Sequence, residues 1–369
     1  PMDLPEISDY RQLFLQRRPL LDVRAPIEFS EGAFPGTTNM PLLTDEERHL
    51  IGIRYKNNGQ DAAVALGHEL IDGTPKQQRV AAWKSFVEQN PNGVLYCFRG
   101  GMRSKISQQW IAEETGVIYP RVKGGYKALR NFLLDELEQA SKEINPIILG
   151  GRTGSGKTIV LQQLQNMLDL EGLAWHRGSA FGRHATAQPT QIDFENALSI
   201  QLLRYRAAGN PQLVIEDEGK SIGSRHLPRS LYDRMCASPL VLLEASIEER
   251  INNSVAEYVV AALTEYRGLY GEQDGFDLWA DYITDSLGRI KKRLGGSRYK
   301  ALNNKLQSAI QRLKKNGDAA CHSDWIRDLL LEYYDPMYDY QIRKKLDRVI
   351  FRGNKEQVTD YLKEGNAAN

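Results

Sequence analysis

The stretch NPIILGGRTGSGKT, residues 145–158, decides how the second half of the chain folds. Residues 147–149 are a short apolar run that predicts a buried strand, and a glycine-rich turn then leads into a helix. From Gly151 to Thr158 the turn matches G-x-x-x-x-G-K-[ST] at every position. In this pattern, successive backbone N–H groups surround phosphate oxygens, the lysine adds a positive charge and the final hydroxyl binds Mg²⁺. We therefore expect an α/β domain that binds a diphosphate or triphosphate.

The candidate ligands of this phosphate are Gly151, Thr153, Gly154, Ser155, Gly156, Lys157 and Thr158. A later apolar segment, PQLVIEDEG at residues 211–219, predicts a strand that ends in three consecutive acids, 216–218. An acid at the tip of a strand beside a phosphate loop can hold a metal-bound water or act as a base. We expect Mg²⁺ at Thr158, Glu216 and Asp217, although solvated acids are also common at strand ends.

The segment HRGSAFGRHA, residues 176–185, lies between the phosphate loop and these acids and mixes basic with small residues. This composition suits a loop that contacts substrate, and a solvated turn is the equally good alternative. The candidate residues of a substrate loop are Arg177, Gly178, Ser179, Phe181, Gly182 and Arg183.

A second candidate site lies in VLYCFRGGMRS, residues 94–104. The pattern predicts a buried strand, a turn and a helix, with Cys97 where the helix dipole and nearby guanidinium groups favour a thiolate. The five residues between Cys97 and Arg103 supply enough N–H groups to surround a tetrahedral anion. The candidate anion ligands are Arg99, Gly100, Gly101, Arg103 and Ser104. The loop length leaves phosphatase chemistry and sulfur or selenium transfer both open, and a buried structural cysteine is the remaining alternative.

Composition limits the class of protein. The 369 residues carry 48 basic and 47 acidic side chains, so binding of a polyanion would depend on local patches. The cysteines at 97, 236 and 321 are too few for a disulfide framework or a structural zinc cluster, and we assign the last two to structure. We expect a cytoplasmic protein without a membrane segment, haem or flavin.

One local basic patch is RIKKRLGGSRYK, residues 289–300, which contains no acid. The candidate contacts with RNA phosphates are Lys291, Lys292, Arg293, Arg298 and Lys300. The alternative is a solvated helix face. Tyrosines in the segment 333–340 can stack on bases, but core packing is the better explanation for them.

Several motifs carry a resemblance to a known family. The segment 22–42, with Asp22, Arg24, Glu28 and Gly32, is similar to the N-terminal rhodanese pattern, and VKGGYKAL, residues 122–129, is similar to its closing motif. A rhodanese domain with the loop C-x-R-G-G-x-R-S, joined to a phosphate-loop domain containing HRGSAFG, resembles the tRNA 2-selenouridine synthases. The segments LLEYYDPMYDYQ and VIFRG extend the likeness over essentially the whole chain.

The resemblance implies an α/β fold in three parts. These are a rhodanese-like parallel-sheet domain at 1–135, a P-loop NTPase-like α/β domain at 136–245, and a mostly helical, basic and aromatic region at 246–369 packed on the second domain.

The resemblance also implies a reaction on tRNA that carries 2-thiouridine at the wobble position. Geranyl diphosphate first places a geranyl group on sulfur, and selenophosphate, delivered by its synthetase, then replaces the S-geranyl group with selenium. We expect the diphosphate in the Gly151–Thr158 loop with Mg²⁺ and selenophosphate at the Cys97 loop, where Cys97 accepts selenium as Cys–Se⁻.

Two other classes remain open. A rhodanese-fold phosphatase or sulfurtransferase fused to an ATP-binding, kinase-like domain predicts ATP turnover and phosphatase activity without RNA. A non-catalytic scaffold that binds RNA or a protein and keeps Cys97 for redox sensing predicts that Cys97→Ser leaves function intact.

Overall fold

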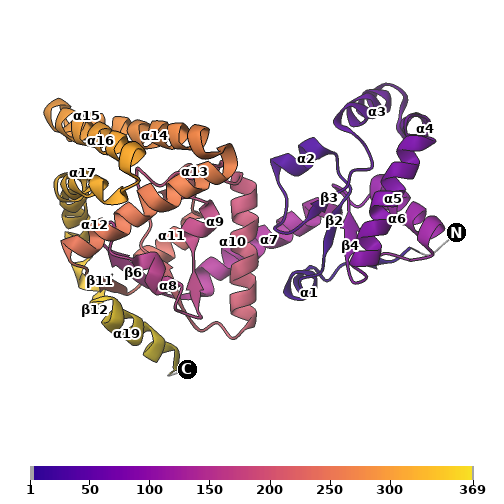
Figure 1. Cartoon of the computed structure of the whole chain (residues 1–369). Helices are drawn as coiled ribbons and strands as arrows, with labels where there is room; N and C mark the ends of the chain where they lie inside the picture. The colour runs from indigo at the N-terminus through magenta and orange to yellow at the C-terminus, as the bar shows by residue number, and fades with distance from the viewer. Residues whose placement is uncertain (1–3, 368–369) are drawn as a thin grey trace. The chain divides into compact units, whose positions relative to one another are not determined.

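A computed structural model describes residues 4–367 and divides the chain into two compact units (Figure 1). The first unit contains the residues up to Gln139 together with Thr190–Arg204, and we call it the cysteine unit. The second contains Ala140–Pro189 and the residues from Tyr205 onward, and we call it the phosphate-loop unit. The first division therefore falls inside helix α7 (Gly125–Glu143).

The cysteine unit is built on a five-stranded sheet in the order β1-β5-β4-β2-β3, in which all neighbouring strands are parallel. The strands are β1 (Glu6–Ile7), β2 (Leu20–Asp22), β3 (Thr38–Asn39), β4 (Val94–Tyr96) and β5 (Arg121–Val122). Strand β4 lies at the centre, and all three of its residues are fully buried. A continuous apolar run of this kind is typical of a parallel strand covered on both faces.

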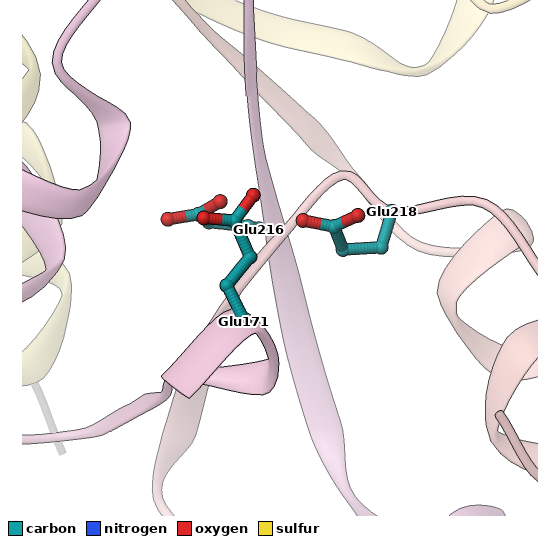
Figure 2. Close-up of side chains that lie close together, drawn as sticks. All are labelled: Glu171, Glu216 and Glu218. Carbon is teal, nitrogen blue, oxygen red and sulfur yellow. The ribbon is translucent and has the colours of Figure 1, made fainter. Parts of the chain in front are cut away.

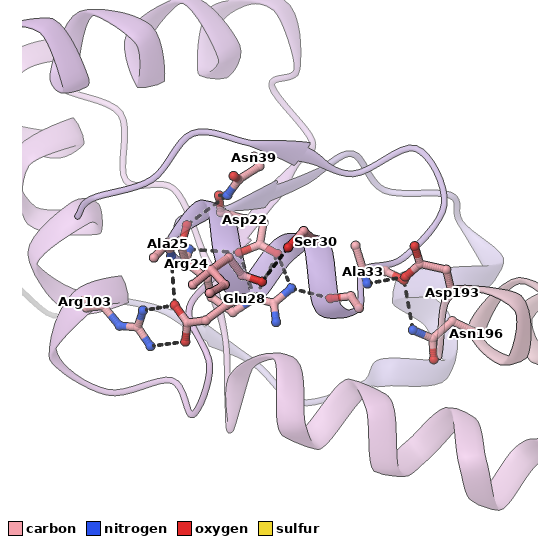
Figure 3. Close-up of polar contacts among 12 residues, drawn as sticks. Asp22, Arg24, Ala25, Glu28, Ser30, Ala33, Asn39, Arg103, Asp193 and Asn196 are labelled. Atoms are coloured by element: carbon pink, nitrogen blue, oxygen red, sulfur yellow. Dashed lines mark hydrogen bonds and ion pairs between the residues drawn. The ribbon is translucent and has the colours of Figure 1, made fainter. Parts of the chain in front are cut away.

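Helices cover this sheet. They are α1 (Tyr10–Leu15), α2 (Pro26–Glu31), α3 (Asp45–Asn58), α4 (Gln60–Ile71), α5 (Thr74–Gln89), α6 (Met102–Thr115), α7 and α10 (Gln191–Ala207). Helix α10 lies far along the chain, yet Ile200 and Leu203 belong to the same apolar cluster as Phe14 and Leu129. Asp193 and Asn196 bond the backbone N–H and C=O of Ala33, at 2.6 and 2.9 Å (Figure 3).

The phosphate-loop unit has a second parallel sheet, in the order β12-β11-β6-β8-β7. Its strands are β6 (Asn145–Gly151), β7 (Met167–Leu168), β8 (Gln212–Glu216), β11 (Leu240–Leu243) and β12 (Val349–Gly353). Strands β6 and β8 are the two predicted from the sequence. Strands β7, β11 and β12 were not predicted. Strand β12 begins with the apolar run 349–351, but it lies at the edge of the sheet, where Ile350 is 50% exposed. A short hairpin, β9 (Ser221–Ile222) and β10 (Arg225–His226), stands apart from the sheet.

The rest of this unit is helical, as the sequence predicted for the region after 245. The helices are α8 (Lys157–Leu161), α9 (Leu170–Ala174), α11 (Arg229–Cys236), α12 (Ile247–Val255), α13 (Ala262–Tyr270), α14 (Glu272–Arg289), α15 (Lys291–Leu294), α16 (Gly296–Asn316), α17 (Ser323–Leu329), α18 (Asp335–Arg343) and α19 (Lys355–Ala367). Helices α12 to α17 are grouped together in Figure 1. Their apolar side chains pack around Trp279 and Trp325, which are fully buried. Within residues 4–367, no helix is both long and apolar enough to cross a membrane.

The predicted fold class is therefore confirmed. Both units are α/β with parallel sheets, and the C-terminal region is mostly helical.

Candidate functional site

Cys97 follows the central strand β4 and begins the turn into helix α6, as the sequence predicted. Its side chain is 2% exposed, and its Sγ lies 3.2 Å from the hydroxyl oxygen of Ser104 in the first turn of α6. The Cys97 thiol donates this bond, and the Ser104 hydroxyl in turn donates to the C=O of Gly101 at 3.1 Å. The sulfur therefore lies at the base of the loop, beside a helix N-terminus.

The backbone of the 124–127 turn holds this loop from the other side. The N–H groups of Tyr126 and Lys127 donate to the C=O groups of Cys97 and Phe98, both at 2.9 Å. Gly100 has a φ of +70°, and a Cβ there would lie 2.8 Å from the nitrogen of Gly124. The two glycine pairs of the motifs thus permit two backbone turns to approach each other.

Arg103 is held by Glu28, which reaches the Cys97 loop from helix α2. The two guanidinium nitrogens of Arg103 lie 2.6 and 3.0 Å from the carboxylate oxygens, which also accept the N–H of Ala25 at 2.9 Å (Figure 3). Burial alone would raise the pKa of Glu28, but Arg103, Ala25 and Arg48 together lower it. Glu28 is therefore ionised at neutral pH and fixes the guanidinium.

Arg99 behaves differently from Arg103. Its side chain is exposed, and its guanidinium carbon lies 5.7 Å from the ring centre of Phe98. It can therefore move toward an incoming anion.

A buried ion pair lies beneath the loop. Arg24 and Asp22 are 2% and 0% exposed, and their closest nitrogen–oxygen distance is 2.7 Å. Arg24, drawn in Figure 3, also donates to the C=O of Gly32 at 2.8 Å. Its guanidinium carbon lies 3.9 Å from the ring centre of Tyr126. A Cβ on Gly32 would collide with the Tyr126 hydroxyl. The pair and the glycine thus brace strand β2 and helix α2 next to the cysteine.

In the phosphate-loop unit, Gly154 and Gly156 have φ values of +81° and +93°. A Cβ on Gly154 would lie 2.6 Å from the C=O of Arg250. Arg250 donates to the C=O of Thr153 at 3.0 Å, and Asn253 donates to that of Gly154 at 2.9 Å. Helix α12 therefore fixes the loop, and no local motif in the sequence points to Arg250 or Asn253.

A cavity of about 520 Å³ opens over this loop. The Ser155 hydroxyl, which lines it, is buried and has no hydrogen-bond partner among residues 4–367. Lys157 donates to the C=O of Gly151 at 2.9 Å, and Thr158 donates to Glu216 at 3.0 Å. An unpaired buried hydroxyl beside a lysine fits an anionic ligand, because a buried polar group is stable only when it is bonded.

Three carboxylates converge at the edge of the same cavity (Figure 2). One oxygen from each of Glu171, Glu216 and Glu218 lies within 4.8 Å of the others. Burial and then the neighbouring carboxylates raise the pKa of Glu171 to about 11, and burial raises the pKa of Glu218 to about 8. Three carboxylates this close together repel each other when ionised, and a bound divalent cation would offset that repulsion. Their oxygen atoms are the ligands that a hard cation such as Mg²⁺ prefers.

Asp217, which the sequence suggested as a metal ligand, points elsewhere. Its carboxylate oxygens lie 2.8 and 3.0 Å from the amine of Lys345. Residues alternate sides along an extended chain, so Glu216 and Glu218 share a side that Asp217 does not. Glu171, from helix α9, was missed because only the tertiary fold brings it here.

The 176–185 loop is divided between the cavity and the core. Arg177, Gly178 and Ser179 line the cavity, whereas Phe181 is fully buried among the helices. Ser179 shares a hydrogen bond of 2.9 Å with the Tyr258 hydroxyl. Gly182 packs on His176, and Arg183 lies 3.2 Å from the hydroxyl of Ser286. The structure thus places the first half of the predicted loop beside the phosphate loop.

Comparison with known proteins covers both units. The model of the tRNA 2-selenouridine synthase AAA domain matches residues 144–369. Proteins named tRNA 2-selenouridine synthase are 52% identical in Bordetella bronchiseptica and 51% identical in Pseudomonas putida strain F1, each over 97% of this chain and 97% of the relative. One from a Sulfurovum species is 50% identical over 98% of this chain and 99% of its own. The chain belongs to the tRNA 2-selenouridine synthase family.

In this member of the tRNA 2-selenouridine synthase family, the basic segment forms α15 and the start of α16. Its five candidate side chains are all exposed, and the amine of Lys291 lies 5.1 Å from the ring centre of Tyr299. Tyr333 and Tyr334 are core residues, whereas Tyr340 is 58% exposed. These five side chains thus form an exposed cationic surface, and two of the tyrosines proposed for stacking are buried.

Proposed function

We propose that this protein converts wobble 2-thiouridine in tRNA to 2-selenouridine through an S-geranyl intermediate, with geranyl diphosphate and selenophosphate as co-substrates. The names of the relatives support the product and the tRNA substrate. The observation that carries the two-step scheme is the presence of two different anion cradles. One is the phosphate loop, in which the Ser155 hydroxyl has no hydrogen-bond partner among the described residues and three carboxylates lie nearby. The other is the Cys97 loop, where Glu28 holds Arg103 in place.

In the first step, the phosphate loop binds the diphosphate of geranyl diphosphate. The sulfur of 2-thiouridine attacks C1 of the geranyl group, so a C–S bond forms and the C–O bond breaks. The diphosphate leaves with the electron pair, and the N3 proton of the base passes to solvent. Lys157, the Ser155 hydroxyl and the N–H groups of the loop offset the charge on the leaving group.

Mg²⁺ would be held by Thr158 and Glu216, as expected from the sequence. Glu171 and Glu218 would be the further ligands, and they replace Asp217 in that role. When bound, the ion would neutralise charge on the diphosphate. Arg177 and Ser179 line the same cavity and are the candidates for contact with the substrate.

In the second step, selenium replaces the S-geranyl group at C2 of the base. Transfer of selenium alone to Cys97, as Cys–Se⁻, would leave phosphorus reduced unless an oxidant were present. We therefore assign the thiolate an attack on the phosphorus of selenophosphate, which forms an S–P bond and releases HSe⁻. HSe⁻ then attacks C2, a C–Se bond forms, the C–S bond breaks, and geranylthiolate leaves and takes a proton from water. Water hydrolyses the phosphocysteine, so the cycle involves no net oxidation.

The residues of the cysteine loop suit this step. Arg103 and Arg99, with the N–H groups of Gly100 and Gly101, provide donors for a tetrahedral anion. The hydroxyl of Ser104 accepts the hydrogen bond of the thiol at 3.2 Å, and it would stabilise a thiolate by turning its own proton from the C=O of Gly101 to the sulfur.

We assign tRNA binding in part to the exposed segment of α15 and α16. The candidate phosphate contacts are Lys291, Lys292, Arg293, Arg298 and Lys300. Each contact is expected to add about −0.7 to −0.9 to the slope of log K for tRNA binding plotted against log salt concentration. Delivery of selenophosphate by its synthetase is part of the same proposal.

The test is mass spectrometry of nucleosides from thiolated tRNA incubated with both co-substrates. Wild type is expected to give selenouridine, and Cys97→Ser to stop at S-geranyl-2-thiouridine. Lys157→Ala should give neither product from thiolated tRNA, yet give selenouridine when S-geranyl tRNA is supplied. A phosphate group on Cys97 should appear in the acid-quenched protein after selenophosphate is added.

Absence of any modified uridine from wild type would overturn the proposal. ATP turnover and phosphatase activity without RNA would then favour the phosphatase–kinase alternative.

A further inference from the structure

A second cavity lies entirely within the cysteine unit, directly beside the Cys97 loop. Its volume is about 490 Å³, and helices α3, α4 and α6 form most of its wall. The wall is largely apolar, and its main members are Ile51, Val64, Ile71, Met102, Ile106 and Trp110. The charged side chains that line it include Arg99 and Arg103, which belong to the cysteine loop.

The helix pair α3–α4 leaves this apolar wall uncovered. Helix α3, which is described throughout, has no fully buried side chain; of its two residues that line the cavity, Ile51 is partly buried and Tyr55 is exposed. Helix α4 buries only Ala63 and Ile71 completely. Ile71 belongs to the apolar core of the unit, whereas Met102 is 41% exposed, and an apolar wall that continues from the core to the surface is typical of a ligand-binding site.

The cavity and the anion cradle share residues. Gly101, Met102 and Arg103 belong to the loop around Cys97 and also line the cavity. A ligand with an apolar chain in the cavity would therefore present the atom attached to that chain to the cysteine loop. This geometry suits a molecule with one long apolar arm and a polar centre.

We propose that this cavity binds the ten-carbon chain of the S-geranyl group while the modified base is at Cys97, and receives the geranylthiol released there. The proposal rests on the second step of the proposed function. In that step the bond between C2 of the base and the sulfur of the geranyl chain breaks, so geranylthiolate is the leaving group. The proposal places this leaving group in the cavity.

Size and polarity agree with this occupant. A ten-carbon chain needs about 300 Å³, at about 30 Å³ for each water-sized group, and the cavity has about 490 Å³. Selenophosphate is a small anion, so an apolar wall of this size would not contribute to its binding. A chain of this length bound only at its sulfur end would leave its apolar surface in water.

The experiment narrows the cavity and compares two leaving groups. Val64→Trp places an indole in the cavity, and Ala65→Trp places the same group on an exposed position of the same helix, outside the cavity. Selenation is measured on tRNA carrying S-geranyl- or S-methyl-2-thiouridine. Val64→Trp is expected to lower the kcat/KM ratio of S-geranyl to S-methyl by at least about tenfold, whereas Ala65→Trp leaves it unchanged.

A second variant distinguishes a blocked cavity from misfolding of Val64→Trp. Val64→Ala enlarges the cavity, and it is expected to raise the rate on S-farnesyl relative to S-geranyl tRNA, a gain that damage to the fold does not produce. Binding is measured directly by calorimetric titration with geraniol. Wild type and Ala65→Trp should bind it, and Val64→Trp should not.

The outcomes separate this inference from the proposed function. If wild type selenates both substrates and Val64→Trp leaves their ratio unchanged, the cavity has another occupant, such as a segment of a partner protein, and the inference is overturned. Equal geraniol binding by Val64→Trp and wild type overturns it as well. If wild type produces no selenouridine, the proposed function fails, and loss of geraniol binding in Val64→Trp still supports an apolar ligand in this cavity.

Discussion

Replacing Arg24 with methionine should destabilise the part of the cysteine unit that holds Cys97. Arg24 is 2% exposed, and its Nε lies 3.1 and 3.0 Å from the two carboxylate oxygens of Asp22, which is fully buried. Removing one member of a buried ion pair costs about 3–5 kcal/mol, because the other charge is left uncompensated. The C=O of Gly32 also loses its donor. We expect a total loss of about 4 kcal/mol, a large share of the ~5–15 kcal/mol that stabilises a domain.

The matched control is the double variant Asp22→Leu/Arg24→Met, which removes both charges. Replacing a whole buried pair with apolar side chains of similar volume is often neutral. We therefore expect the double variant to recover much of the stability that Arg24→Met loses, apart from the cost of two unpaired backbone groups. These are the C=O of Gly32 and the N–H of residue 24, which donates to the Asp22 carboxylate at 2.9 Å in the wild type.

The assay is hydrogen exchange of peptides that contain β2 and β4, together with the rate at which Cys97 reacts with a thiol reagent. A loss of about 4 kcal/mol corresponds to almost a thousandfold increase in both rates, at about 1.4 kcal/mol per factor of ten. A loss below about 1 kcal/mol, or a double variant as damaged as the single one, would refute the reasoning. The pair would then act through packing volume and not through its charges.

Three further changes test other parts of the structure. Gly154→Ala places a Cβ 2.6 Å from a C=O of α12 at a φ of +81°, so calorimetry should show at least about tenfold weaker binding of inorganic diphosphate; unchanged affinity would contradict the loop geometry. Glu28→Gln releases Arg103 and should raise KM for selenophosphate. Because the pKa of Glu28 is lowered, the ion pair with Arg103 is fully formed above the usual pKa of a free carboxyl and is lost as the pH falls and Glu28 takes up a proton. Wild-type activity should therefore decrease at acid pH, and this decrease should be smaller in Glu28→Gln. Burial lowers the pKa of His322 to about 4, so the unfolded chain takes up the proton first and stability should fall by up to about 3 kcal/mol between pH 6.5 and 4; thermal melts of wild type should show this slope, and His322→Gln should lack it.

Local chemistry made both loops predictable. The phosphate loop depends on glycines at positive φ followed by a lysine and a threonine, and those requirements are read from neighbouring residues. The same holds for the strand, turn and helix around Cys97. The alternation of 216–218 also contained the information that Glu218, and not Asp217, shares a side with Glu216.

The missing parts depend on contacts between distant segments. Glu171 and Arg250 reach the phosphate loop from α9 and α12, and neither lies in a motif that points there. Strand β12 is an edge strand with polar and exposed positions, so its pairing with β11 is decided by the sheet and not by its own pattern. The apolar cavity of the cysteine unit has no sequence signature, because it is formed by what α3 and α4 leave unfilled.

The position of α10 in the cysteine unit has a consequence for synthesis on the ribosome. Residues 190–204 complete the apolar cluster around Phe14 and Leu129, but they are translated only after the phosphate loop has emerged. The sheet of the phosphate-loop unit, in turn, lacks its edge until residue 353 is made. Domains generally fold as units while the chain grows, yet here the cysteine unit is still incomplete when synthesis of the phosphate-loop unit begins. The nascent chain therefore carries a complete first sheet that lacks the covering helix α10 together with an unfinished second sheet, and a gene truncated after residue 139 would encode a cysteine unit with part of its core exposed.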